Sequence, residues 1–230
     1  SHPGRQFQTH GATNAMTRFL LIMLVGVLSS CNVIAPIAAV IEPEDTTARA
    51  YRLPNRPCVI FVEDRVGAIG MNLPGVRSRI GKQATTYLLG NEIHSRMIEP
   101  DDALRVAEAS DRASQMLSLS EIARRCSADL MVNVQVRAWA LVGQDGVPRP
   151  TATAIVRVLD MTKRQQVFPD PNGEGREGFV VAQLPITDPN KVRSRQDARR
   201  VNLELADELG LQIARLFDEY VTAPLGKNLR

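Results

Sequence analysis

The sequence predicts an α/β fold of the α+β sandwich type, in which helices pack on a small mixed β-sheet and the chain ends in a long helix. Cys58–Glu63 is a continuous apolar, β-branched run, which is typical of a buried strand. Leu130–Val142 alternates between two faces as a half-buried strand does, and Thr151–Asp160 follows as another strand. The residues after 193 repeat apolar side chains at three- and four-residue steps, which indicates an amphipathic helix. Helical patterns between the strands complete the prediction of a sheet packed by helices.

The segment that follows the first strand is expected to be a loop and then two helices. Asp64–Gly75 contains three glycines and a proline, so it is predicted to be a loop. An apolar stripe predicts a helix over Val76–Asn91, and His94–Ile98 is a short strand candidate. A proline followed by aspartate suits the first turn of a further helix over Asp101–Gln115.

The middle of the chain is expected to add a short helix and a long strand. Ser120 is predicted to cap the short helix, whose Ile122, Ala123 and Cys126 face inward. Alternation in the strand places two sets of side chains on opposite faces: Met131, Asn133, Gln135, Arg137 and Trp139 on one, and Val132, Val134, Val136 and Ala138 on the other.

The last third is expected to hold a hairpin, an edge strand and the long helix. Gln166–Phe168 extends the hairpin that begins with Thr151–Asp160, and Phe179–Leu184 is a short edge strand candidate. Ser194 and Asp197 have the spacing of a capping box and predict the start of the last helix. Its apolar stripe runs through Tyr220, so we expect the helix to end near Pro224.

The N-terminal region resembles a bacterial lipoprotein signal. Met16 is the expected start, and a short cationic segment followed by an apolar run is typical of a secretory signal. The segment that ends at Cys31 resembles the bacterial lipobox, and it reads Leu28, Ser29, Ser30 and Cys31. This resemblance implies cleavage between Ser30 and Cys31 and lipid attachment at Cys31.

Attachment by acyl chains would anchor the protein stably, since each buried CH2 contributes about 0.8 kcal/mol. Asn32 follows the cysteine where an inner-membrane retention signal has aspartate, so we expect an outer-membrane lipoprotein that faces the periplasm. An uncleaved inner-membrane anchor over residues 19–41, which carry no charge, and ordinary secretion are the alternatives. All three place the rest of the chain outside the cytoplasm.

These features predict five parts of the chain. They are a leader upstream of the start (1–15), a signal peptide (16–30), a lipidated cysteine and flexible tether (31–57), a periplasmic α/β domain (58–223) and a tail (224–230). Within the domain, Cys58 and Cys126 are either two buried thiols or one disulfide, because an oxidising compartment allows both.

Signatures of catalysis and of cofactor or metal binding are missing, so we expect neither catalytic residues, nor a cofactor, nor a metal. His94 is the only histidine after the expected start, which leaves no multi-histidine zinc site and little basis for a serine triad, and we expect it to be an exposed side chain. Gly75–Gln83 misses the phosphate-loop spacing, and a loop that begins at Asp170 lacks the closing glutamate of a calcium site. Glu63 and Asp64 are adjacent on a strand and so point apart, which makes them a poor catalytic pair.

One cationic cluster is the candidate contact site for a ligand or partner. It lies ahead of and within the last helix, where positive charge opposes the helix dipole. Its members are Lys191, Arg193, Arg195, Arg199 and Arg200. The alternatives are a solvated helix entry, or contact with anionic lipid, cell-wall glycan or an acidic partner.

The overall charge does not support nucleic-acid binding. The chain has 28 basic and 25 acidic residues, a formal charge of +3. Residues 1–30 contain Arg5 and Arg18 and no acid, so removing the predicted leader and signal leaves 26 basic residues against 25 acidic ones. Aromatic residues make up only 4%, which disfavours a stacking surface for single strands.

The body of the chain resembles the periplasmic α/β domain shared by the TolB amino-terminal domain, CsgG-type secretion lipoproteins and LpoB-like activators of cell-wall synthases. The resemblance lies in the opening strand with its acidic end (CVIFVEDRVG), the helix and strand over Leu119–Val134, the hairpin over Thr151–Phe168 and the long last helix. It implies a non-enzymatic, membrane-anchored envelope accessory that binds other proteins in assembly, secretion or cell-wall synthase regulation. Binding of cell-wall glycan or anionic lipid through residues 191–200 is the alternative function.

Overall fold

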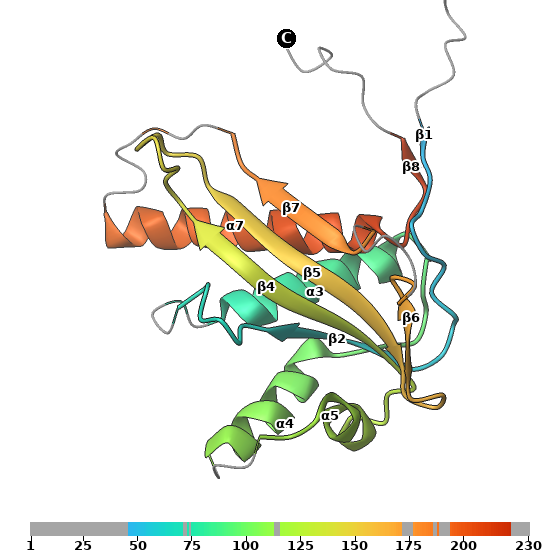
Figure 1. Cartoon of the computed structure of the whole chain (residues 1–230). Coiled ribbons are helices and arrows are strands. Elements are labelled where there is room, and N and C mark those ends of the chain that lie inside the picture. The colour runs from blue at the N-terminus through green and yellow to red at the C-terminus, as the bar shows by residue number, and fades with distance from the viewer. Residues whose placement is uncertain are drawn as a thin grey trace, which may run out of the picture. The chain divides into compact units, whose positions relative to one another are not determined.

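Two helices cover one face of a six-stranded mixed sheet, and two more cover part of the other face (Figure 1). The computed structural model describes residues 46–221 without 71–72, 74, 113–115, 172–176, 186–187 and 189–193. The predicted fold class, with its mixed sheet and long last helix, is confirmed.

The sheet is built around three long, adjacent strands. Its order is β3-β2-β4-β5-β6, with β7 pairing alongside β5 as well. The strand β2 runs parallel to β3 and β4, and the remaining pairs are antiparallel. The strands are β2 (Cys58–Glu63), β3 (Met97–Ile98), β4 (Leu130–Ala140), β5 (Thr151–Asp160), β6 (Gln165–Phe168) and β7 (Phe179–Gln183).

The helices divide between the two faces of this sheet. On one face α3 (Val76–Gly90) packs against α7 (Arg195–Arg215), and both contact the strands. On the other face α4 (Pro100–Arg112) and α5 (Leu119–Arg125) lie together beside β2 (Figure 1). We call the first the α3/α7 face and the second the α4/α5 face.

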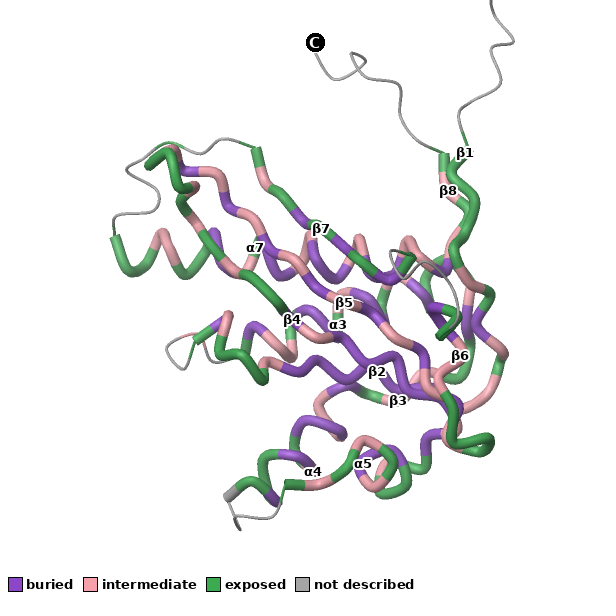
Figure 2. Tube along the Cα trace, in the orientation of Figure 1, coloured by how far each residue is buried: buried purple, intermediate pink, exposed green. Residues whose placement is uncertain are grey.

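The larger hydrophobic core fills the α3/α7 face (Figure 2). Alternate strand residues such as Ile60 and Val132 meet Ile80, Leu205 and Leu209 from the two helices, and all five are fully buried. The helices approach so closely that a Cβ on Gly210 would lie 2.6 Å from the carbonyl oxygen of Ile80. A glycine is therefore required at this crossing.

The smaller core lies on the α4/α5 face and ends part-way across the sheet. Val59, Phe61 and Met131 pack there against alanines of α4 and against Ile122 of α5. Leu159 at the end of β5 packs against this core, whereas no helix among the described residues covers this side of β7.

A β-bulge corrects the predicted facing of Trp139. The register of β4 against β5 shifts between Val136 and Ala138, so every residue beyond the bulge turns to the opposite face. Trp139 therefore lies on the α3/α7 face, where its Nε1 donates to Oδ1 of Asn202 at 2.6 Å. Ala138 takes the place on the α4/α5 side that alternation assigned to Trp139.

Two helix ends also differ from the prediction, whereas one is confirmed. The hydroxyl of Ser118, not that of Ser120, accepts from the backbone N–H of Glu121 and caps α5. Ser194 caps α7 as predicted, through the N–H of Asp197 at 3.0 Å. The helix α7 ends at Arg215 rather than near Pro224, because the chain turns there and forms another strand.

That strand joins the two ends of the described chain. β8 (Tyr220–Val221) pairs antiparallel with β1 (Thr46–Thr47), and the N–H of Ala50 donates to the carbonyl of Leu216 at 2.8 Å. The first and last described residues therefore lie side by side.

The folded body begins before Cys58, so residues 46–57 are not part of a flexible tether. Leu53 is 5% exposed, and the ring of Tyr51 lies 5.4 Å from the ring of Phe168. Arg56 forms an ion pair with Asp160 at 2.6 Å. These contacts hold the segment against the sheet, because apolar burial and a charge pair outweigh the freedom it loses.

The two cysteines of the domain are free thiols. Cys58 belongs to the core on the α3/α7 face, whereas Cys126 packs on the α4/α5 face, so the sheet separates them. Burial raises the pKa of the Cys58 thiol to about 12, which makes it unreactive at neutral pH.

The predicted membrane attachment lies outside the described residues. This applies to Ser30 and Cys31 and to the alternative anchor at residues 19–41. Within the part of the chain that is described, no helix combines the length and apolar character that a membrane crossing requires.

Candidate functional site

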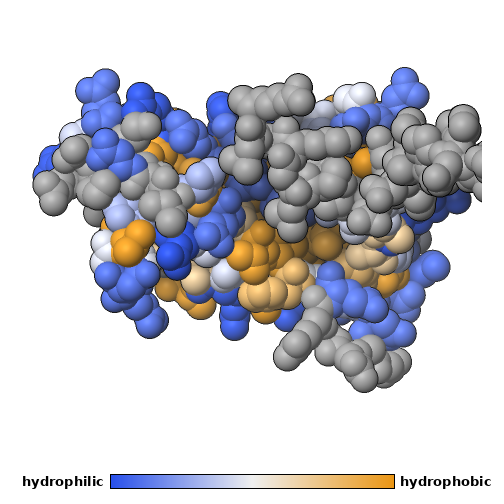
Figure 3. Space-filling view, turned by 90° about the horizontal axis from the view of Figure 1, so that it is seen from above, coloured by the Kyte–Doolittle hydropathy of each residue, from blue (hydrophilic) through white to orange (hydrophobic). Residues whose placement is uncertain are grey.

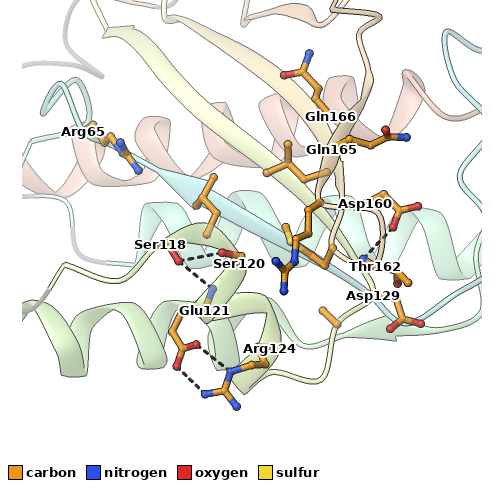
Figure 4. A pocket seen from close by; sticks show the side chains of 15 residues that line it. Arg65, Ser118, Ser120, Glu121, Arg124, Asp129, Asp160, Thr162, Gln165 and Gln166 are labelled. Carbon is orange, nitrogen blue, oxygen red and sulfur yellow. Dashed lines mark hydrogen bonds and ion pairs between the residues drawn. The ribbon is translucent and has the colours of Figure 1, made fainter.

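A groove of about 930 Å³ lies between α5 and the β5–β6 hairpin (Figure 4). One wall comes from the start of α5 and the other from the hairpin turn, with Arg65 at the far end. Its apolar lining comes from Leu119, Ala128, Leu159 and Met161.

The α5 wall carries a carboxylate that is already engaged. Glu121 accepts hydrogen bonds from Arg124 at 2.7 and 2.9 Å and from Arg125 at 2.9 Å. The two guanidinium groups lower the pKa of this carboxyl to about 2. Glu121 is therefore an ionised partner of arginines and not a general acid at neutral pH.

The hairpin wall carries a second engaged carboxylate, Asp160, which is 2% exposed. It accepts from Arg56 at 2.6 Å and from the backbone N–H groups of Thr162 and Lys163 at 3.0 Å each. The bond from Arg56 is the main reason that the pKa of Asp160 is lowered. Asp160 thus holds the turn and the segment before β2 in place.

Two serine hydroxyl groups of the groove lie at the start of α5. The Ser118 and Ser120 oxygens lie 3.0 Å from each other, and neither has a hydrogen bond to a histidine. No group of three or more histidine, cysteine, aspartate or glutamate side chains within the described residues is arranged to hold a metal ion. The groove offers arginines, hydroxyl groups and an apolar floor as contacts for a ligand.

His94 is buried rather than exposed, which corrects the expectation. It is 2% exposed, and its Nε2 lies 3.0 Å from the carbonyl oxygen of Pro54. The N–H of Arg96 donates to Nδ1 at 3.2 Å, so the proton belongs on Nε2. Burial lowers the pKa of this imidazole. His94 ties the segment before β2 to the loop before β3.

Glu63 and Asp64 make separate structural contacts. On the α4/α5 side, Oε1 of Glu63 forms an ion pair with the guanidinium of Arg65 at 2.9 Å. Its Oε2 accepts a hydrogen bond from Nε2 of Gln135 at 3.2 Å. The Asp64 carboxylate accepts from the N–H groups of Ala68 and Ile69 and shapes the following loop.

The uncovered part of the α4/α5 side is the second candidate surface. Register places Gln135, Ile155 and Phe179 in one row across β4, β5 and β7, and Ala138, Thr153 and Val181 in the next. We call these two rows the open face. Phe179 is 51% exposed and Val181 is 47% exposed. Seen from the side of β7, apolar side chains gather in the middle of the surface, with hydrophilic ones around them (Figure 3).

Two arginines stand beside the open face. Arg137 lies at the bulge of β4 and is exposed, and Arg157 lies on β5 and is half-buried. Neither takes part in an ion pair with any side chain that the structure describes. The open face therefore combines exposed apolar groups with two arginines that have no ion-pair partner among the described residues.

The structure describes only part of the predicted cationic cluster. Lys191 and Arg193 lie outside the described residues, and Arg195 and Arg199 are exposed on the first turns of α7. Arg200 forms ion pairs with Asp197 at 3.3 Å and Glu204 at 3.9 Å. Part of the cluster is thus neutralised on its own helix.

Sequence reasoning missed both the groove and the open face. The sequence of Phe179–Gln183 gave no signal for the open face, because FVVAQ is apolar at both alternating sets of positions up to Gln183. The groove had no local signal, since its walls come from segments far apart in the chain.

No protein-family model matches the chain, and no curated protein has a matching sequence. Among solved structures, the hypothetical protein CT253 of Chlamydia trachomatis is similar at 16% identity and a TM-score of 0.41, over 70% of this chain and 91% of that one. The PelC dodecamer of Paraburkholderia phytofirmans is similar at 12% identity and a TM-score of 0.36, over 76% and 96%. Lipoprotein GNA1162 of Neisseria meningitidis is similar at 13% identity and a TM-score of 0.32, over 65% and 92%.

The similar structures therefore include one bacterial lipoprotein. At this level of similarity, neither a fold family nor a function transfers to this chain. The resemblance to the TolB, CsgG and LpoB group stays a prediction.

Proposed function

We propose that this chain is a bacterial envelope lipoprotein, anchored through Cys31, whose domain binds another envelope protein and catalyses no reaction. The anchor rests on the lipobox-like sequence that ends at Cys31. The single observation that carries the binding function is the open face, where Phe179 and Val181 are about half exposed beside unpaired arginines. Exposed apolar groups gathered on one surface mark a contact site for a partner.

Three titratable side chains that could take part in acid–base chemistry are held by other contacts. Glu121 and Asp160 are held by arginines, and His94 is buried between two backbone groups. Their geometry favours binding over acid–base chemistry.

The layout of the domain also suits a module held at one end. The chain from the predicted anchor enters at β1, beside the C-terminal end of α7. The helix has 21 residues and so is about 30 Å long, with Arg195 and Arg199 at its other end. The described part of the cationic cluster therefore lies at the opposite end of α7 from β1.

The anchor is tested by labelling cells with a lipid precursor. We expect label on the wild-type chain and none on Cys31→Ala, while Cys126→Ala, a matched cysteine change in the domain, keeps the label. A wild-type chain without lipid contradicts the anchor. Location in the outer membrane, expected from Asn32, is read from the same cells by membrane fractionation.

The binding function is tested by isolating the full chain from detergent-solubilised membranes. We expect one partner at a fixed ratio, recovered equally with Arg195→Glu and Arg199→Glu. A chain recovered alone contradicts the function. Loss of the partner with the Arg195 and Arg199 changes assigns the contact to the cationic cluster instead.

A further inference from the structure

The outer edge of β7 presents backbone groups that pair with no strand in the described part of the chain. The N–H of Leu184 donates to the carbonyl oxygen of Pro150, and the N–H of Val156 donates to that of Gly178. These two bonds show which residues of β5 and β7 form hydrogen-bonded pairs. By alternation, the backbone groups of Val180 and Ala182 point toward β5. Those of Phe179, Val181 and Gln183 point away from the sheet.

No strand among the described residues pairs with this outer edge. Sheet edges are commonly protected by charge, proline or a bulge. The strand β7 reads FVVAQ, with none of these devices. The side chains of Phe179 and Val181, which lie on the open face, are apolar and half exposed. An edge of this kind is suited to accept another strand.

The charge of the open face indicates which side chains the added strand would carry. Arg137 and Arg157 lie on the same side of the sheet as Phe179 and Val181 and have no described ion-pair partner. The neighbouring Glu63 is already held by Arg65 and Gln135, and Glu177 is exposed two residues before β7. An incoming segment with carboxylates would compensate the two arginines.

We propose that β7 accepts an extended segment of the partner protein as an added strand, with apolar residues at alternate positions and acidic residues that face Arg137 and Arg157. The main-chain bonds form with Phe179, Val181 and Gln183, and the apolar side chains extend the row of Phe179 and Val181. This proposal rests on the proposed function, since it names the partner surface of the same domain.

A second copy of this chain fits the edge less well. Two β7 strands would place Arg137 and Arg157 of both copies on one continuous face, and the described residues next to β7 offer only Glu177 of each copy as a carboxylate against these four arginines. Charge complementarity therefore favours an acidic partner segment over self-pairing.

The test uses the full chain in detergent micelles and a displayed library of random linear peptides as the probe. We expect the enriched peptides to alternate apolar residues and to carry aspartate or glutamate. Enrichment of basic peptides, or of no peptide, overturns the proposal.

Two variants at one position separate main-chain pairing from side-chain contact. Val181→Pro removes an outward N–H that β5 does not use, so the sheet is expected to keep its fold while peptide binding weakens at least about tenfold. Val181→Thr keeps the N–H and the branched shape and is expected to bind within about threefold of the wild type. Equal binding by the wild type and Val181→Pro overturns the proposal.

Amide exchange on the wild-type chain gives a second measurement that does not depend on the variants. Bound peptide is expected to slow exchange at Phe179, Val181 and Gln183, while Val180 and Ala182 are slow already. Unchanged exchange at the first three overturns the proposal.

Two further outcomes are informative. Concentration-dependent self-association that Val181→Pro abolishes assigns the edge to a second copy and overturns the proposal. A native partner that still binds Val181→Pro leaves the proposed function intact and refutes only the added strand, whereas a chain without any partner refutes the function itself.

Discussion

The two faces of the sheet are covered to different extents, although the same strands form both. On the α3/α7 face, strand residues and two long helices form a continuous apolar core from β2 to β7. On the α4/α5 face, a smaller core ends near Phe61 and Met131, and the remaining surface carries polar, cationic and half-exposed apolar side chains. The first face accounts for folding, and the second leaves room for contact with a partner.

The difference between the faces predicts a large difference in sensitivity to truncation. Leu209→Ala removes a fully buried side chain from the α3/α7 core and is expected to lower the free energy of unfolding by about 2–5 kcal/mol. Val181→Thr on the open face is expected to change it by less than about 0.5 kcal/mol. Urea denaturation of both variants measures the contrast, and equal losses would contradict it.

The close approach of α3 and α7 gives the next largest effect. Gly210→Ala places a methyl group against the carbonyl of Ile80 and is expected to destabilise the fold by about 1–3 kcal/mol. Gly90→Ala, at the end of α3 with nothing within 4 Å of the added carbon, is the matched control. It should leave stability unchanged or raise it, by up to about 1 kcal/mol. A neutral Gly210→Ala would mean that the helices lie farther apart.

The border between the covered and open parts of the α4/α5 face holds an unusual residue. Asn133 is 1% exposed, and neither its amide nitrogen nor its oxygen has a hydrogen-bond partner. Asn133→Leu removes this desolvation cost and is expected to stabilise the fold by about 1 kcal/mol. Gln135→Leu loses a hydrogen bond to Glu63 and should give no gain. Destabilisation by Asn133→Leu in urea denaturation would refute this.

The smallest predicted effect concerns pH. Burial lowers the pKa of His94, and the neighbouring positive charge of Arg96 lowers it further. As pH falls through the ordinary histidine value of about 6.5, the unfolded state binds protons first, so stability is complete above that pH and declines below it. His94→Gln should have a lower free energy of unfolding than the wild type at pH 8. It should lose less of that free energy than the wild type when the pH falls below the ordinary histidine value. An identical pH profile for the wild type and the variant would rule out His94 as the cause.

Local patterns in the sequence were enough to predict most of the fold. The run Cys58–Glu63 and the strand Thr151–Asp160 have the predicted bounds, and Ser194 caps the last helix as its spacing with Asp197 indicates. Each of these features depends on residues that are close in sequence, so periodicity and capping chemistry are enough to find them.

Features that depend on distant residues were not visible in the sequence. The bulge that turns Trp139 arises from the pairing of β4 with β5, and α7 ends early because β8 pairs with β1. The burial of His94 depends on Pro54, far from it in the chain. The open face could be located only once the helices had been assigned to their faces, because exposure of Phe179 and Val181 depends on what does not cover them.

The open face is the proposed partner-binding surface of the proposed envelope lipoprotein. Photo-crosslinking in intact cells that express the full chain tests it most directly, with a photoreactive residue in place of Phe179 or, as control, of the exposed Thr86 on α3. We predict one discrete crosslinked species from position 179 and none from position 86. A crosslink from position 86 with none from position 179 would contradict the account.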